Sequence, residues 1–385
     1  MNTNLKKVLV TGARAPVALH LCRILKESGM EVFAADSISY ALAKTSNSIN
    51  DFFLLPSPKK NSSEYIFSLL NIIQTNQIDI LIPTCEESFY ISMHKEKLSI
   101  YCEVLVGDFD KMELLHNKYD FIEYVNSLGF KTPKTLKLTK NNTKEDINEF
   151  FKDQLVLKRI FSRFSDKVLF LHKNEFVSLP TMIDSTWIAQ ERIEGNQYCS
   201  YGVAKHGKLL AHSVYKTEFT AGIGATISFS YTERKDIELF VKAIVENLNF
   251  TGQISFDFIV NSENIAIPIE CNPRATSGLH LFDKNLITCL NGKNTDTLYP
   301  DFSTKEAITL ALIAYSIDNW KLNKPFSKWL KTLLTHRDIT FRLTDISPFF
   351  YQFVSMFLLW KDSKKNNLTM TEQSTLDISW DGEIT

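Results

Sequence analysis

The first hundred residues alternate between short apolar runs and longer segments with helical periodicity. Strands are expected at Val8–Thr11, Glu31–Ala35 and Ile78–Pro83, with helices at Val17–Ser28 and Tyr65–Thr75. This alternation predicts βαβ units and therefore a parallel sheet with helices on its faces. The turn after the first strand contains only Gly12, whereas a dinucleotide site needs three glycines for close approach of the pyrophosphate. An NAD site is not expected here.

Charged residues at the strand ends suggest where a ligand would bind. Arg14 follows the first strand, and Glu86 and Glu87 follow the third. Open α/β sheets bind ligands at the carboxyl ends of their strands, so these side chains could line a substrate cleft. A solvated loop is an equal alternative.

A second informative feature is a pair of strands, Gly252–Phe258 and Ile267–Arg274, separated by the polar residues Asn261–Asn264. With Ser262-Glu263 as a two-residue loop, Asp257 would lie opposite Pro268, and Glu270 diagonally beside it on the same face. Asn272 follows on that face by the period of two. Two carboxylates and an amide oxygen suit Mg²⁺. The alternative is an ordinary hairpin with solvated acids, since a one-residue slip would separate the carboxylates.

Asp257 together with Glu270-Cys271-Asn272-Pro273-Arg274 resembles the metal-binding signature of the ATP-grasp superfamily, which includes D-alanine–D-alanine ligase, biotin carboxylase and the carbamoyl-phosphate synthetase large subunit. The resemblance extends to about Phe282. It implies an α/β chain with a Rossmann-like parallel-sheet domain in residues 1–108. An ATP-grasp domain would follow in 109–300, with a small α+β lid at about 135–192 and an antiparallel-sheet core. Residues 301–385 would form a mainly helical segment and tail.

The same resemblance implies which residues hold ATP. Lys118 and Lys158 would contact the phosphates, although each lysine alone is more often a surface charge. Backbone groups near Glu191 and Ile193 would contact the adenine edge, and Gln197 or Glu194 the ribose hydroxyls. Residues 159–167 contain no glycine, unlike many lid loops of the family. There, Ser162, Arg163 and Ser165 could contact the phosphates. The alternative is a lid that binds ATP poorly.

The reaction implied by the resemblance is formation of an acylphosphate from ATP and a carboxylate, followed by attack of an amine to give an amide. Mg²⁺ or Mn²⁺ would bind Asp257, Glu270 and Asn272, and Arg274 would stabilise the acylphosphate. His280 is either a general base for the amine or a packing residue. Two other functions stay open: a nucleotide-binding protein without turnover, and a bicarbonate-activating enzyme similar to carbamoyl-phosphate synthetase.

Composition limits the partners. The chain has 43 Lys and Arg against 44 Asp and Glu, with no basic block, so nucleic acid is not expected as a partner. Six scattered cysteines without a CxxC pair, and no apolar signal segment at the N-terminus, are typical of a cytoplasmic protein. The apolar run Phe349–Trp360 is too short to span a membrane and is expected to be a buried helix rather than a membrane-surface one. It is also a candidate surface for a homodimer.

Overall fold

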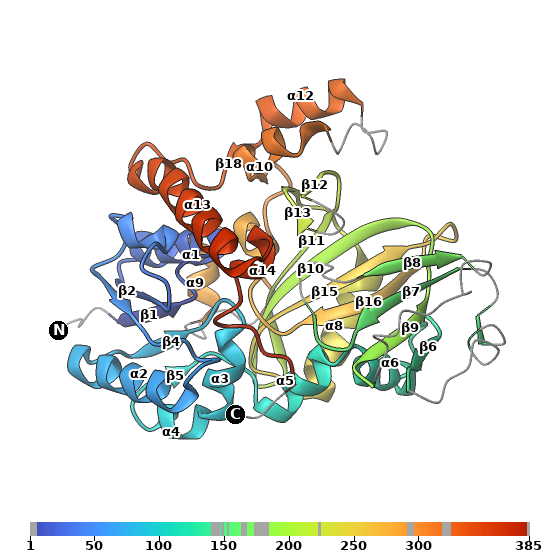
Figure 1. Cartoon of the computed structure of the whole chain (residues 1–385), viewed down its shortest axis with the longest axis horizontal. Coiled ribbons are helices and arrows are strands. Elements are labelled where there is room, and N and C mark those ends of the chain that lie inside the picture. The colour runs from blue at the N-terminus through green and yellow to red at the C-terminus, as the bar shows by residue number, and fades with distance from the viewer. Residues whose placement is uncertain are drawn as a thin grey trace.

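The computed structural model describes residues 6–139, 147, 150–151, 154–162, 168–172, 185–221, 225–290, 296–317 and 325–382. Figure 1 shows an N-terminal α/β layer, a β-rich central region and C-terminal helices that lie above the N-terminal layer. The α/β class and the order of these parts agree with the expected fold.

The N-terminal sheet has five parallel strands in the order β3-β2-β1-β4-β5. Its side chains are apolar on both faces because helices cover both: Val8, Leu9 and Val10 of β1 are fully buried. This confirms the predicted parallel sheet. The elements of this layer are β1 (Lys7–Thr11), α1 (Pro16–Glu27), β2 (Glu31–Asp36), η1 (Leu42–Thr45), β3 (Asp51–Leu54), α2 (Ser62–Asn76), β4 (Ile80–Ile82), α3 (Glu87–Met93), α4 (Lys95–Ser99) and β5 (Glu103–Val104).

The central region contains two four-stranded sheets. The lid sheet has the order β6-β9-β7-β8, and the core sheet has the order β11-β10-β15-β16. All of their strand pairs are antiparallel. The elements are α5 (Phe109–His116), α6 (Lys118–Ser127), β6 (Thr135–Lys137), β7 (Gln154–Arg159), β8 (Leu169–His172), β9 (Trp187–Glu191), β10 (Asn196–Lys205), β11 (Lys208–Lys216), β12 (Thr220–Ala221), β13 (Ala225–Thr226), α8 (Lys235–Asn247), β15 (Gly252–Val260), β16 (Ala266–Asn272), η3 (Ser277–Leu281) and α9 (Asn285–Leu290).

Alternation along β15 fixes which face of the core sheet is buried. Phe256 and Phe258 are almost completely buried and contact Phe240 of α8 at ring-centroid distances of 5.2 and 5.3 Å. Phe121 of α6 stacks on Phe256 at 6.0 Å. Because successive side chains of a strand point to opposite faces, this aromatic cluster directs Asp257 to the other face.

In its described residues the C-terminal part adds a small sheet and several helices. Its strands have the order β14-β17-β18, and α13 and α14 lie beside the N-terminal layer in Figure 1. The elements are β14 (Ser228–Ser230), β17 (Lys305–Ala307), α10 (Thr309–Ala314), α12 (Phe326–Thr335), β18 (Arg337–Asp338), α13 (Ser347–Asn366) and α14 (Met370–Gln373).

Helix α13 differs from the expected buried helix. Of its twenty residues only Pro348, Gln352 and Ser363 are buried. Apolar side chains are at least 43% exposed at Phe350, Phe353, Val354, Met356, Phe357 and Trp360. The prediction of a buried helix is wrong because the N-terminal layer covers only one side of α13. No helix in the described part of the chain is long and apolar enough to cross a membrane. A homodimer through this face stays a prediction.

A buried ion pair joins α1 to the C-terminal part. Arg23 is 1% exposed, and its Nε donates to Asp345 Oδ2 at 2.8 Å. Its two terminal nitrogens donate to the carbonyl oxygens of Ile339, Thr340 and Asp345. Asp345 also accepts hydrogen bonds from the Ser46 hydroxyl and the Asn47 N–H. A buried charge with this many partners is costly to leave unpaired.

We expect Asp345→Asn to lower the free energy of unfolding by about 3 kcal/mol or more, because Arg23 would become a buried charge without a counterion. The matched control is Glu27→Gln, whose partner Arg342 lies 2.6 Å away in a partly exposed pair (48% and 30% exposed). That pair should contribute less than about 1 kcal/mol. Urea unfolding followed by circular dichroism measures both. Equal losses in the two variants would contradict the prediction.

A second buried carboxylate lies in the small C-terminal sheet. Glu306 of β17 is paired at 2.6 Å with Arg337 of β18, but the Glu306 side chain is 8% exposed and the arginine 79%. Burial raises the pKa of Glu306 from 4.5 to about 6, and Arg337 opposes the shift. The folded chain therefore binds this proton more tightly than the unfolded chain does.

Between about pH 4.5 and 6 the free energy of unfolding should fall as pH rises, by up to ~2 kcal/mol for this group. We expect Glu306→Gln to remove that loss. The variant should then unfold at a higher urea concentration than the native chain at pH 7.5, and the difference should vanish toward pH 4.5. The measurement is the urea midpoint of both chains across this pH range. A difference that is constant with pH would contradict the assignment.

Candidate functional site

The hairpin of β15 and β16 brings two carboxylates face to face, by a register that differs from the predicted one. The Asn261 N–H donates to the Ile265 carbonyl at 3.1 Å, so the loop has three residues, with Asn264 at φ 61°. Phe258, rather than Asp257, therefore lies opposite Pro268. With this turn alone, Asp257 would face Ile269, and Glu270 would point to the opposite face of the sheet.

A β-bulge restores the alignment. The register shifts between Asp257 and Phe258, so Ile269 has no partner residue and Glu270 pairs directly with Asp257. The Ile269 carbonyl instead accepts a hydrogen bond from Lys158 Nζ at 3.1 Å. The longer loop and the bulge each add one residue, and together they return both carboxylates to one face. The predicted diagonal pair is in fact a directly opposed pair.

The environment of this pair fits a cation. Burial, and the facing Glu270 carboxylate, raise the pKa of Asp257 above its usual range. Two carboxylates held together in this way repel each other, and a divalent cation would remove the repulsion. Asn272 fits less well as a third ligand, because its Oδ1 accepts from Arg274 at 2.9 Å and its amide faces Asp257 Oδ2 at 3.5 Å. Its oxygen would have to leave Arg274 to reach a metal.

Two buried lysines converge on the same carboxylates. Lys118, 2% exposed, lies 3.2 Å from Glu270 Oε1 and donates to the Ser162 carbonyl at 3.1 Å. Asn117 caps α6, and so orients Lys118 at the first position of the helix. Burial lowers the pKa of Lys158 to about 8; Glu270 opposes the shift and Lys118 adds to it. Both cations predicted from the sequence are therefore beside the carboxylate pair.

The residues predicted to bind the nucleotide lie in different environments. Ser162 is at the end of β7, where its carbonyl binds Lys118, whereas Arg163 and Ser165 lie outside the described residues. Gln197 of β10 pairs with Ile259, two residues after Asp257, so its side chain is on the face of Asp257. Glu194 is exposed.

The two hinge residues predicted to contact adenine differ in whether their backbone groups are already hydrogen-bonded. The N–H of Glu191 is already bonded to the Lys134 carbonyl at 2.8 Å, and its carboxylate accepts from the Lys134 N–H at 3.1 Å. Ile193 forms no backbone hydrogen bond with any other described residue. Of these two residues, Ile193 is the one whose N–H and C=O are both available to a ligand edge.

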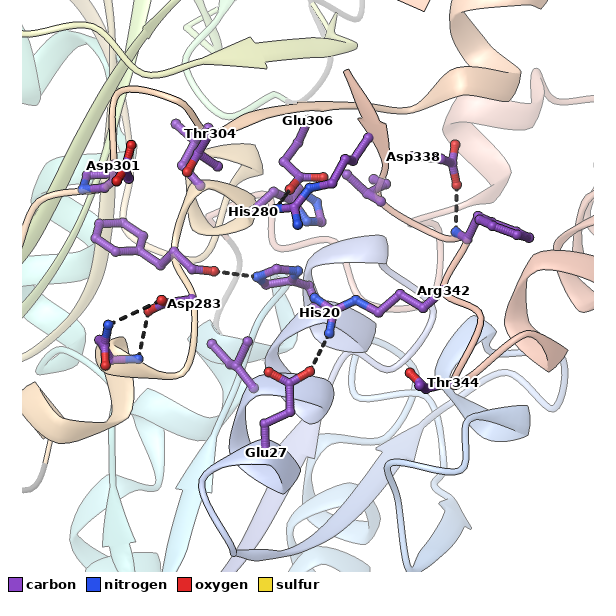
Figure 2. Close-up of a pocket in the computed structure, with 18 of the residues that line it drawn as sticks. His20, Glu27, His280, Asp283, Asp301, Thr304, Glu306, Asp338, Arg342 and Thr344 are labelled. Atoms are coloured by element: carbon purple, nitrogen blue, oxygen red, sulfur yellow. Dashed lines mark hydrogen bonds and ion pairs between the residues drawn. The ribbon is translucent and has the colours of Figure 1, made fainter. Parts of the chain in front are cut away.

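His280 is not brought to the carboxylates. Its ring lies 5.2 Å from the ring of His20 on α1 and 5.8 Å from Phe229, and it lines a cavity of about 860 Å³ (Figure 2). Within the described residues no contact joins it to Asp257 or Glu270. Burial lowers its pKa well below the usual value. A neutral, buried histidine in another cavity is placed as a packing residue rather than as a base for this site.

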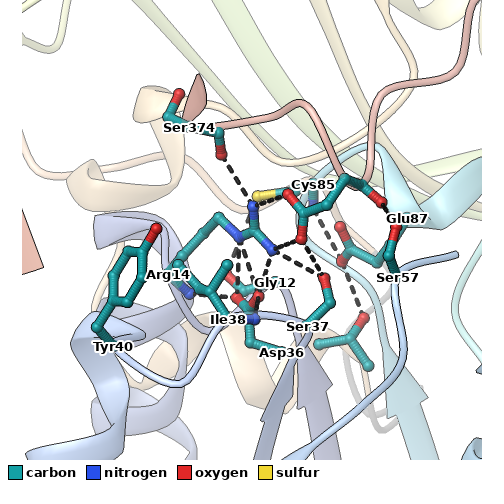
Figure 3. Close-up of polar contacts among 12 residues, drawn as sticks. Gly12, Arg14, Asp36, Ser37, Ile38, Tyr40, Ser57, Cys85, Glu87 and Ser374 are labelled. Carbon is teal, nitrogen blue, oxygen red and sulfur yellow. Dashed lines mark hydrogen bonds and ion pairs between the residues drawn. The ribbon is translucent and has the colours of Figure 1, made fainter. Parts of the chain in front are cut away.

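Arg14, expected to line a substrate cleft or to lie in a solvated loop, is instead held in two ion pairs. Its guanidinium forms ion pairs with Asp36 at 2.5 Å and Asp377 at 2.6 Å, and donates to the Ser374 carbonyl (Figure 3). Glu87 is buried and accepts from the Thr11 hydroxyl and the N–H groups of Thr84 and Cys85. The C-terminal segment therefore occupies this edge of the sheet.

One neighbour of the carboxylates has no signal in the sequence. Cys199 of β10 lies directly opposite Asp257, on the side away from Glu270. Burial raises the pKa of its thiol well above the usual value, so the thiol stays neutral. The pairing of β10 with β15 joins residues about sixty positions apart, and short-range patterns do not predict it.

Comparison with known proteins agrees with this geometry. A family model described as an ATP-grasp domain matches residues 115–278. Among solved structures, N5-carboxyaminoimidazole synthetase from Staphylococcus aureus, complexed with ADP, has a TM-score of 0.62 at 12% identity, over 84% of this chain and 88% of that chain. No curated protein sequence matches significantly.

Two further structures are similar over most of their length. The biotin carboxylase domain of the 2-oxoglutarate carboxylase from Hydrogenobacter thermophilus, in complex with MgADP, ADP and bicarbonate, has a TM-score of 0.60 at 15% identity, over 78% of this chain and 73% of that chain. The L-amino acid ligase from Bacillus licheniformis has a TM-score of 0.55 at 13% identity, over 71% and 68%. Such identities show a shared fold. The family match identifies an ATP-grasp domain in residues 115–278 of this chain.

Proposed function

We propose that the chain is an ATP-dependent ligase that activates a small-molecule carboxylate as an acylphosphate and joins it to an amine. The observation that carries the proposal is the opposed pair Asp257–Glu270 with Lys118 and Lys158 beside it. Phosphoryl transfer needs positioning and charge neutralisation more than a covalent protein nucleophile. Two anions and two cations on one sheltered sheet face supply such an environment.

In this proposal each described residue has a defined task. Asp257 and Glu270 would hold Mg²⁺, which neutralises phosphate charge when it is bound. Lys118 and Lys158 would bind the phosphate oxygens, and Arg274 would orient the transferred group from beside Asn272. The Ile193 backbone would contact the adenine edge, and Gln197 would reach the ribose from the face of Asp257.

The acid and the amine are left open by these residues. Bicarbonate is one candidate for the carboxylate, in line with a bicarbonate-activating reaction. A nucleotide-binding protein without turnover is the alternative in which the same residues bind MgATP but no ADP appears.

The test is ADP release from the purified chain with MgATP, in the presence of pools of amino acids, other small carboxylates including bicarbonate, and amines. We expect ADP only with particular pools. Glu270→Gln keeps the side-chain shape but removes one of the two anionic charges, and should lower the rate about 100- to 1000-fold. MgATP binding without ADP release in any pool would favour the protein without turnover.

The matched control is Glu263→Gln in the turn of the same hairpin. Glu263 is 65% exposed, forms an ion pair with the exposed Lys131 at 3.2 Å and accepts a hydrogen bond from the Asn261 amide at 3.4 Å. The same chemical change there should leave ADP release unchanged. If both variants lost activity equally, the effect would come from the hairpin fold and not from the Asp257–Glu270 pair.

A further inference from the structure

The last described residues form a segment that we call the C-terminal strap, Thr369–Gly382. It begins with α14, which has a capping box between Thr369 and Glu372, and then crosses the N-terminal layer near α3 and α5 (Figure 1). Asp377 anchors it through the ion pair with Arg14 (Figure 3). The Ser57 hydroxyl donates to the Asp377 carbonyl at 2.7 Å, and the Tyr90 hydroxyl to the Ser379 carbonyl at 2.9 Å.

Trp380 is the main apolar contact of the strap. It is 2% exposed, and its ring stacks on Phe89 of α3 at 4.8 Å. Phe109 of α5 and Phe161 contact the ring edge-on, at 5.5 and 4.9 Å, and His116 of α5 contacts it in a tilted arrangement at 6.2 Å. A buried aromatic ring with this many partners restrains each of them.

Phe161 belongs to the wall of the phosphate site. The residues on either side of it are bound to Lys118: the Lys118 N–H donates to the Ile160 carbonyl at 3.3 Å, and its Nζ to the Ser162 carbonyl at 3.1 Å. The same ammonium lies 3.2 Å from Glu270. The end of β7 is therefore held by Lys118 through its backbone and by the strap through the Phe161 ring.

Gly382 shows how closely the strap follows that ring. A side chain on Gly382 would place its Cβ 2.5 Å from Phe161 Cε2, and the residue has φ +91°. Only glycine adopts this conformation readily and leaves room for the ring. A cavity of about 400 Å³ next to this contact is lined by Arg159, Ser162 and residues of the strap, so the strap and the end of β7 enclose a common space.

We propose that Trp380 is a positioning residue for the phosphate site: through Phe161 it fixes the end of β7, and so the place of the Lys118 ammonium beside Glu270. This inference rests on the proposed function, because it assigns the wall of the same site. A displacement of about 1 Å in such a group can cost about 100-fold in rate. The strap is then part of the nucleotide site, although it begins about a hundred residues after Glu270 in the chain.

The test is a double-mutant cycle with Trp380→Leu and Phe161→Leu in the full chain, with MgADP binding measured by calorimetry. Each single variant should weaken binding about 10- to 100-fold. The double variant should be no weaker than the weaker single one, because both remove the same contact. Trp380→Phe keeps a ring and should restore most of the affinity. Trp360→Leu, at a 47% exposed tryptophan of α13, is the control and should bind as the native chain does.

A structural role alone is excluded by a third variant. Phe89→Leu removes the stacking partner of Trp380 on the N-terminal side without touching the contact with Phe161. If the strap only anchored the N-terminal layer, Phe89→Leu would weaken MgADP binding as much as Trp380→Leu at the same loss of thermal stability. That outcome, or additive effects in the cycle, would overturn the inference. If Trp380→Leu does not fold, Phe161→Leu carries the test alone: native MgADP affinity in that variant would overturn the inference. A native chain that binds no MgADP would refute the proposed function instead.

Discussion

Two carboxylates that face each other across one rung of a strand pair are unfavourable unless positive charge lies beside them. In this chain the rung is Asp257–Glu270, and the positive charge comes from Lys118 and Lys158. Lys118 is brought there by the start of α6, and Lys158 by β7, an inner strand of the lid sheet. The core sheet, the lid sheet and the helix between them are therefore arranged around one electrostatic requirement.

Burying the two lysine ammonium groups is itself energetically unfavourable. Burial lowers the pKa of Lys158 to about 8, because desolvation disfavours the charged ammonium more than Glu270 favours it. Phosphate oxygens would offset that desolvation, as a divalent cation would offset the repulsion between the carboxylates. The carboxylates and lysines that pair with one another in this site could also bind the cation and the phosphates of MgATP, and this complementarity is the physical basis of the proposed function.

Local patterns were sufficient for the N-terminal sheet and for choosing Asp257 and Glu270 as candidates. The alternation of β1, α1 and β2 is a short-range signal, and so is the single acid within each of two apolar strands, Asp257 in β15 and Glu270 in β16. The register of the hairpin was mispredicted because a three-residue loop and a bulge cannot be told from a two-residue loop by composition. The burial of α13 was mispredicted for another reason. This helix packs against η1, far away in the sequence, and against α14, which leave its other side exposed.

The strap is the strongest example of such a non-local contact. Arg14 and Asp377 are separated by 363 residues, and no periodicity or motif links them. No motif marks this tail in the sequence, yet Ile378 and Trp380 are almost fully buried. The two ends of the chain are therefore joined by an ion pair and an aromatic contact at the carboxyl edge of the first sheet.

The bulge at Ile269 has a consequence for how this hairpin can vary. Each inserted or deleted residue between Asp257 and Glu270 exchanges the two faces of β16, so a single change in length would place one carboxylate in the aromatic core. Only changes in pairs keep the two carboxylates together: the loop can shorten by one residue only if the bulge is lost as well. Among natural variants of this hairpin, the number of residues between the two acids should therefore remain even.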